Sequence, residues 1–324
     1  MKVRKKYVFV VLFIMVLASS LVLIKDVSKK DVTIYDVAVI IRGKSSEEWS
    51  VIKAGMDQAS SEMNVNLRFT TLLEENSVRE QKELMERELG SGTDAILISP
   101  ADYSELSDII ENINKKIPIV LFESNINTKQ DIPYISCDNY RLGQELAEEV
   151  VRNGNTRSNI VIVKSDLTYS SIQERYLGFI DEISKSKNTY ETLEFPTDES
   201  KLYNNIRSLM EDNKVDVIVT FEPNILEVIG TAKKYVINNS NITSNIEVYG
   251  TGRTSTIISL IEEEIIDAIA IQNEFNVGYL SIETAVNKLE NKKNDSKINI
   301  TSTLINSRNM YSEENQKMLF PIVR

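Results

Sequence analysis

The stretch TDAIL at residues 93–97 decides the fold, because it recurs as VDVIV at residues 215–219. Each is a short apolar run that begins at an aspartate, which is typical of a strand buried inside a parallel sheet. Other features repeat at about the same interval of 122 residues. The run VAVII at 37–41 corresponds to IVIV at 160–163, and Gly55 corresponds to Gly178. The repeats predict that one folding unit is built twice.

Helical patterns separate the apolar runs. Helices are predicted at residues 49–63, 80–89 and 105–114, and strands at 67–69, 95–98 and 118–122. Two copies of a βαβαβαβ unit predict an α/β fold with two doubly wound parallel-sheet lobes joined by a hinge. We expect residues 33–137 with 273–303 in lobe 1, and 138–272 with 304–324 in lobe 2. Ligands of such sheets bind beyond the carboxyl ends of the strands, so a closing cleft is predicted between the lobes.

Composition excludes most catalytic chemistry. The 324 residues include no histidine and a single cysteine, Cys137, which rules out a Ser-His-Asp triad, an internal disulfide and a cysteine-based zinc site. We therefore expect no enzyme activity, no catalytic residues, no metal and no cofactor. The net charge of −11 also makes the chain a poor partner for nucleic acid.

The first 32 residues are expected to lie outside the fold. Residues 1–6 form a basic tip, residues 7–24 an apolar run of about 27 Å as a helix, and residues 25–32 a linker. The basic tip should stay in the cytoplasm, which predicts a single-pass transmembrane anchor with the bulk of the chain extracellular. The alternative is a signal peptide cleaved near Ala18. The anchor is favoured because the apolar run continues past that site.

Five segments together resemble the type I periplasmic sugar-binding proteins. They are GSGTDAILISPAD at 90–102, IPIVLFES at 117–124, ISCDN at 135–139, QERYLGF at 173–179 and VDVIVTFEPN at 215–224. The similarity extends over residues 37–287. This family shares its fold with the ligand-binding cores of sugar-responsive repressors, but those carry a helix-turn-helix segment where this chain has the apolar run.

The resemblance implies ligand-binding residues in lobe 1. Trp49 falls where the family places an aromatic platform for a sugar ring, and Glu123 where it has an acidic acceptor of hydroxyl hydrogen bonds. Ser99 takes the place of another polar family residue. The structural alternatives are a core tryptophan and an exposed carboxylate at a strand end.

Further candidates follow the other strands. Asp138, beside Asn139, matches a family pair at the lobe crossing, although it is equally suited to cap the next helix. Gln173 stands where the family has an arginine, and Glu222 where it has an amide. Arg253 follows a glycine that replaces a family aspartate, and Gln272 matches a glutamine near the hinge.

Two glutamates and one arginine are expected to have structural roles. Glu47 and Glu48 are adjacent at a helix start. Carboxylates at this position more often stabilise the helix dipole than act as the catalytic pair of a glycosidase. Arg175 matches a family arginine that is more often structural. The departures at Gln173, Glu222 and Gly252 argue against simply copying ribose as the ligand. A neutral polar ligand of sugar size is still expected, because an aromatic platform with several polar groups suits a sugar, while Glu123 and Glu222 together leave a cationic ligand as an alternative.

The resemblance extends to a subgroup of membrane-anchored sugar sensors that work with a sensor histidine kinase. It implies a monosaccharide ligand, with D-xylose as the first choice, and signalling to that membrane kinase. It also allows a dimer formed through the partner complex. The alternative is the substrate-binding component of a sugar ABC transporter, whose partner is a permease.

Overall fold

The computed structural model describes residues 33–165, 168–195, 198–212, 214–239, 245–293 and 295–320. The chain from Asp36 onward forms one compact unit. Among the described residues, none of the helices combines the length and the apolar character needed to span a membrane. The expected anchor at residues 7–24 and the linker at 25–32 lie outside the described residues.

Lobe 1 is built on a six-stranded sheet with the order β11-β5-β4-β3-β1-β2. The pairings of β1 with β3, β3 with β4, β4 with β5 and β5 with β11 are parallel. Its elements are β1 (Tyr35–Ile40), α2 (Glu47–Met63), β2 (Val65–Thr70), α3 (Val78–Gly90), β3 (Ala95–Ile98), α4 (Ser107–Asn114), β4 (Ile119–Phe122), β5 (Tyr134–Cys137), α10 (Glu274–Leu289) and β11 (Lys297–Ile300).

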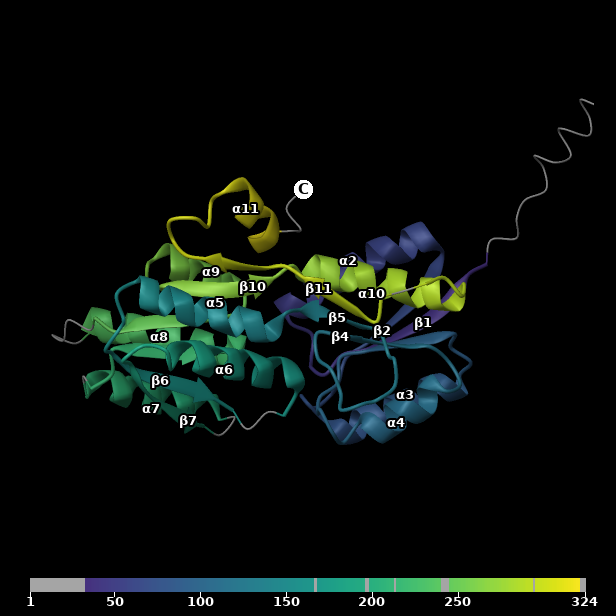
Figure 1. Cartoon of the computed structure of the whole chain (residues 1–324), viewed down its shortest axis with the longest axis horizontal. Helices are drawn as coiled ribbons and strands as arrows, with labels where there is room; N and C mark the ends of the chain where they lie inside the picture. The colour runs from purple at the N-terminus through teal and green to yellow at the C-terminus, as the bar shows by residue number, and fades with distance from the viewer. Residues whose placement is uncertain are drawn as a thin grey trace, which may run out of the picture. The chain divides into compact units, whose positions relative to one another are not determined.

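Lobe 2 repeats this arrangement with the strand order β12-β10-β9-β8-β6-β7. Figure 1 shows the two lobes, with α6 and α7 in lobe 2 and α3 and α4 in lobe 1. Its one antiparallel pairing among the described strands joins β12 to β10. Its elements are α5 (Asn139–Arg152), β6 (Asn159–Lys164), α6 (Ser170–Ile183), β7 (Thr189–Glu194), α7 (Glu199–Glu211), β8 (Val217–Thr220), α8 (Pro223–Asn239), β9 (Glu247–Thr251), α9 (Ser255–Glu262), β10 (Ala268–Gln272), β12 (Ser302–Ile305) and α11 (Glu313–Leu319).

The chain crosses between the lobes three times. The crossings follow β5, β10 and β11, at Asp138, Asn273 and Thr301. The third comes earlier than the sequence predicted, because Ser302 and Thr303 already pair with Gln272 and Ile271 in the sheet of lobe 2. Lobe 1 therefore ends near residue 300 instead of 303.

Glycines explain why the same helix packing occurs in both lobes. Helix α10 packs on α2 in lobe 1, and α5 packs on α6 in lobe 2. A Cβ atom at Gly278 would lie 1.9 Å from the carbonyl oxygen of Ile52, and one at Gly178 would lie 1.9 Å from that of Tyr140. Any larger residue would push the paired backbones apart. The predicted fold of two parallel-sheet lobes is confirmed, and the repeated glycines have a packing cause.

Candidate ligand-binding cleft

A cavity lies between the two lobes, beyond the carboxyl ends of their strands, where ligands of doubly wound sheets bind. Its free volume is ≈ 50 Å³. A water molecule takes about 30 Å³ in the liquid, and small-molecule sites usually measure about 300–1,000 Å³. Side chains therefore fill most of the space. The lining includes Arg42, Glu48, Trp49, Glu123, Tyr169, Arg175, Phe221, Thr251, Gly252, Gln272 and Glu274.

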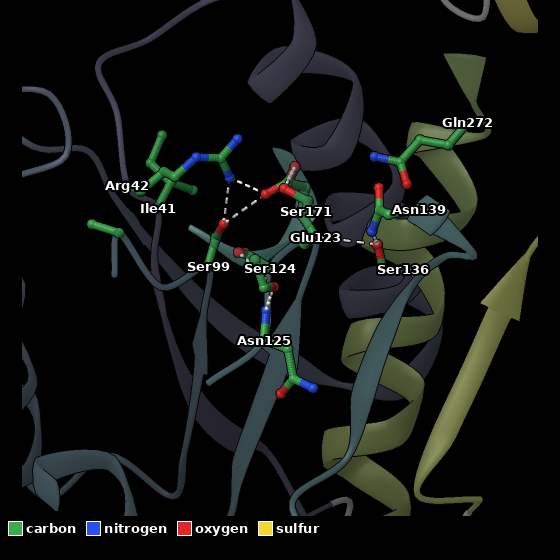
Figure 2. A network of polar contacts seen from close by, with 12 residues as sticks. Ile41, Arg42, Ser99, Glu123, Ser124, Asn125, Ser136, Asn139, Ser171 and Gln272 are labelled. Carbon is green, nitrogen blue, oxygen red and sulfur yellow. Dashed lines mark hydrogen bonds and ion pairs between the residues drawn. The ribbon is translucent and has the colours of Figure 1, made fainter. Parts of the chain in front are cut away.

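Glu123 joins the two lobes across this cavity (Figure 2). Its Oε2 accepts hydrogen bonds from Arg42 and Ser99 of lobe 1. Its Oε1 accepts a hydrogen bond of 2.9 Å from Ser171 of lobe 2 and lies 3.9 Å from Nη2 of Arg175. The residue is buried and has a φ of 63°, a left-handed backbone that a non-glycine residue rarely adopts. Both oxygens are thus engaged by protein groups from both lobes.

Arg42 lies between two aromatic rings. Its guanidinium carbon is 5.0 Å from the centre of the Trp49 ring and 4.1 Å from that of Tyr169, which belongs to lobe 2. The start of α2 positions Trp49, because Ser46 caps this helix by accepting a hydrogen bond from the Trp49 backbone N–H. The indole also packs edge-on against Phe122, with ring centres 6.2 Å apart. A cation between two aromatic faces is a stabilising arrangement.

A buried ion pair joins Glu274, which lines the cavity, to Arg253, which does not. Nε of Arg253, from the loop after β9, is 3.0 Å from Oε2 of Glu274, the first residue of α10. Both side chains are at least 90% buried, yet neither atom has a hydrogen bond among the described residues. Burial raises the pKa of Glu274 well above its ordinary value. Arg253 also donates to the carbonyl oxygens of Met318 and Leu319 at the end of α11.

Glu48 lines the same cavity and is half-buried. Burial raises the pKa of its carboxyl group to about 7, although Arg175 and Arg42 act in the opposite direction.

Residues at the lobe crossings are tied to each other. Oε1 of Gln272 accepts a hydrogen bond of 3.2 Å from the backbone N–H of Cys137, which joins two crossing strands. Asn139 accepts a hydrogen bond of 2.8 Å from Nε of Arg175 and donates to Ser136. Cys137 is buried, and burial raises its thiol pKa to about 11, so it stays a protonated thiol.

The structure brings some of the predicted site residues together and leaves others apart. Trp49, Glu123 and Gln272 line the cavity. Ser99 does not line it, but its hydroxyl accepts a hydrogen bond from Arg42 and donates one to Glu123, which both do. Arg253 does not line the cavity, but it is paired with Glu274, which does.

The remaining three predicted residues, like Ser99 and Arg253, do not line the cavity. Asp138 is exposed and caps α5 by accepting a hydrogen bond of 3.0 Å from the backbone N–H of Arg141. Gln173 is half-buried on α6. Glu222 is buried, but its carboxylate turns back to accept hydrogen bonds of 2.7 and 2.6 Å from Ser165.

Sequence reasoning missed five charged or aromatic residues of the cavity: Arg42, Glu48, Tyr169, Phe221 and Glu274. A signal existed for Arg42, which directly follows a buried strand, and for Glu48, which precedes Trp49. Tyr169 precedes α6 and Glu274 begins α10, and only the tertiary fold brings these two helix starts to the cleft. Arg175 was expected to be structural, and it lies at the cavity wall with several internal hydrogen bonds.

The described residues contain no group of three or more His, Cys, Asp or Glu side chains that could hold a metal ion.

The family model described as "Periplasmic binding protein domain" matches residues 37–293. The chain belongs to the periplasmic binding protein family. Members of this family are binding proteins without catalytic activity, so the expectation that the chain is not an enzyme is confirmed. Membership also indicates an extracytoplasmic location.

Solved structures share this periplasmic binding protein fold at low sequence identity. A carbohydrate transporter solute-binding protein from Agrobacterium radiobacter, in complex with D-arabinose, is 18% identical with a TM-score of 0.81, and the match covers 89% of this chain and 99% of that chain. A solute-binding protein from Agrobacterium vitis with bound D-fucose is 18% identical with a TM-score of 0.81, covering 88% and 100%. A chain of the XylFII-LytSN complex is 20% identical with a TM-score of 0.73, covering 85% and 99%. No curated protein sequence gives a significant match.

Proposed function

We propose that this periplasmic binding protein is a membrane-anchored sugar receptor that closes on a monosaccharide and signals to a membrane sensor kinase. The observation that carries the sugar proposal is the aromatic slot between Trp49 and Tyr169, one ring from each lobe, beside carboxylates and guanidinium groups. Flat apolar rings suit the C–H face of a sugar, and the charged groups suit its hydroxyls. D-xylose is our first choice among the ligands.

A sugar needs more room than the ≈ 50 Å³ of free volume provides. Binding therefore requires the lobes to separate at the three crossings, and it requires Arg42 to leave the aromatic slot or to move aside within it. Ligand then shifts the balance between open and closed forms by its differential affinity for them. Trp49 and Gln272 line the cavity and are our proposed direct contacts, while Glu123, Ser99 and Arg253 organise the cleft around the ligand.

Two candidate partners correspond to the two roles of such a receptor. The occurrence of this fold in the XylFII-LytSN complex supports a role in which a binding protein acts together with a second protein. Solved neighbours described as transporter components support the alternative, a supply subunit for an ABC permease. The anchor at residues 7–24 favours the sensor, because a tethered receptor stays beside a membrane partner.

The partner can be identified by co-purification. Full-length protein with a C-terminal affinity tag should be cross-linked in intact cells, with and without D-xylose, and purified from membranes. Recovery of a sensor kinase in a sugar-dependent manner is the expected result. Recovery of a permease instead would support transport, and recovery from the soluble fraction with residues 1–24 removed would contradict the anchor.

A further inference from the structure

Glu48 differs from the other carboxylates of the cleft in its contacts. It lines the cavity, and it forms no hydrogen bond or ion pair within the part of the chain that the structure describes. Glu123 is engaged by residues of both lobes, and Glu274 is paired with Arg253. Glu48 is therefore the cavity carboxylate that the closed protein does not use for itself.

Charged groups from every surrounding element face Glu48. Arg42 comes from the loop after β1, Glu123 from the end of β4, Arg175 from α6, Arg253 from the loop after β9, and Glu274 from the start of α10. With Glu48, the set contains three arginines and three glutamates. Within this set, Arg253 and Glu274 are paired with each other, with Nε and Oε2 3.0 Å apart, so Glu48 is the carboxylate left for a ligand.

We infer that Glu48 contacts the ligand and accepts hydrogen bonds from its hydroxyl groups. This inference rests on the proposed sugar-binding function and names the residue that selects the ligand. It also reassigns the acceptor role that the sequence suggested for Glu123, whose oxygens are occupied by protein donors.

The chemistry of a carboxylate fits this role. An ionised carboxylate accepts hydrogen bonds at both oxygens and donates none, so it can accept hydrogen bonds from two neighbouring sugar hydroxyls. A site built to bind hydroxyls rejects analogues that lack them, because its polar group would be left unpaired. Glu48 adjoins Trp49 in the chain, so one helix start supplies both the ring that packs on the sugar and the oxygen that binds its hydroxyls.

The protonation of Glu48 sets the direction of the pH effect. Burial raises its pKa to about 7, so the carboxyl is about half protonated at neutral pH before ligand arrives. Hydroxyl donors stabilise the ionised form and lower the pKa in the complex. Affinity should therefore rise with pH, by roughly tenfold between pH 6 and pH 8.

The full-length chain in detergent should be titrated by calorimetry with D-xylose, D-arabinose and D-fucose at pH 6, 7 and 8, in buffers of different ionisation enthalpy. A sugar that binds should do so roughly tenfold more tightly at pH 8 than at pH 6, with proton release at pH 7. Glu48→Gln should bind roughly tenfold or more weakly at pH 8 and lose the pH dependence. Glu62→Gln is the matched control, because Glu62 is on the same helix but bonds to Tyr279 away from the cavity, and it should behave as the wild type.

The outcomes separate this inference from the function on which it rests. A sugar that binds with the same dissociation constant at pH 6 and pH 8, or a Glu48→Gln variant that keeps the wild-type pH dependence, would overturn the role of Glu48 and leave the sugar receptor standing. If no sugar binds, both proposals fail.

Trp49, the single tryptophan, supplies a check that needs no ligand: its fluorescence should titrate near pH 7 in the wild type but not in Glu48→Gln. An unchanged titration in the variant would assign it to another group and contradict the inference.

Discussion

The carboxylate of Glu47 in lobe 1 accepts two hydrogen bonds of 2.7 Å from Ser255 in lobe 2, one from its backbone N–H and one from its hydroxyl. The two residues are 208 positions apart, and their hydrogen bonds join the two lobes. Ser255 begins helix α9, so the carboxylate also meets the positive end of a helix dipole. Sequence reasoning placed Glu47 at the dipole of its own helix, and the structure adds this contact with a helix of the other lobe.

Loss of this contact should shift the protein towards the open form. Glu47→Gln removes the charge and one acceptor oxygen, and we expect sugar affinity to fall roughly five- to tenfold, since each exposed hydrogen bond contributes about 0.5–1.5 kcal/mol. Small-angle scattering of the sugar-bound protein should also show a larger radius at subsaturating ligand. Glu62→Gln serves again as the control and should change neither quantity. Equal affinities for Glu47→Gln and the wild type would remove the contact from the closing mechanism.

The buried ion pair between Arg253 and Glu274 should matter for stability. Arg253→Met leaves a buried carboxylate without its cation and removes two hydrogen bonds to the end of α11. Breaking a buried pair typically costs about 3–5 kcal/mol. The free energy of unfolding in guanidinium chloride, followed by tryptophan fluorescence, measures this loss. Lys53→Met breaks the exposed pair with Asp57 and should cost less than about 1 kcal/mol. A comparable loss in the two variants would contradict the assigned role.

Alanine at Gly278 should weaken lobe 1. Its Cβ would lie 1.9 Å from the carbonyl oxygen of Ile52, so α10 and α2 must separate, at a cost of about 1–3 kcal/mol or more. Gly90→Ala is the control, since nothing lies within 4 Å of a Cβ there and the helix should gain about 0.5–1 kcal/mol. Thermal melting of both variants provides the comparison. The packing account fails if Gly278→Ala melts at or above the wild-type temperature.

Trp49→Ala should weaken sugar binding by roughly 1–3 kcal/mol if the indole packs on the ligand. Tyr235→Ala removes an exposed ring on α8, outside the cavity lining, and should leave the dissociation constant unchanged. Calorimetry of both variants against the same sugar measures the difference. An unchanged dissociation constant for Trp49→Ala would remove this residue from the site.

The raised pKa of Glu48 also predicts how stability depends on pH. The folded protein holds the proton up to about pH 7, whereas the unfolded chain releases it near its ordinary pKa of about 4.5. Between these values the folded state binds more protons, so the free energy of unfolding should fall as pH rises, and then level off above about pH 7. Glu48→Gln should show a shallower decline over this interval when denaturation is measured at steps of pH. A parallel decline in the variant would assign the effect to other groups, such as Glu274.

Local sequence predicted the scaffold better than the site. Strands such as β3 are short apolar runs whose four residues are all buried, so their pattern alone identifies them. The sequence predicts that lobe 1 ends at residue 303, whereas it ends near residue 300. Only the pairing of Ser302 with Gln272 reveals where the sheet of lobe 2 begins. Glu222 follows a strand as expected, but its side chain turns towards Ser165, and strand order alone does not specify such a turn.

The charged lining of the cleft could not be predicted for a related reason. Arg42 and Glu123 are 81 positions apart, and Glu123 meets Arg175 only because the two lobes face each other. Helix-start residues such as Glu48 and Glu274 are ordinary dipole-stabilising carboxylates in the sequence. Their place in the cavity depends on how α2 and α10 are packed, which no local pattern encodes.

The central claim is that the cleft between the lobes binds a monosaccharide. The most direct test is calorimetric titration of the full-length chain in detergent with a panel of neutral sugars that includes D-xylose, D-arabinose and D-fucose. The account predicts saturable binding of at least one sugar at a stoichiometry of about one, weakened by Trp49→Ala and by Glu47→Gln. Absence of binding by every sugar of the panel at millimolar concentration would contradict it.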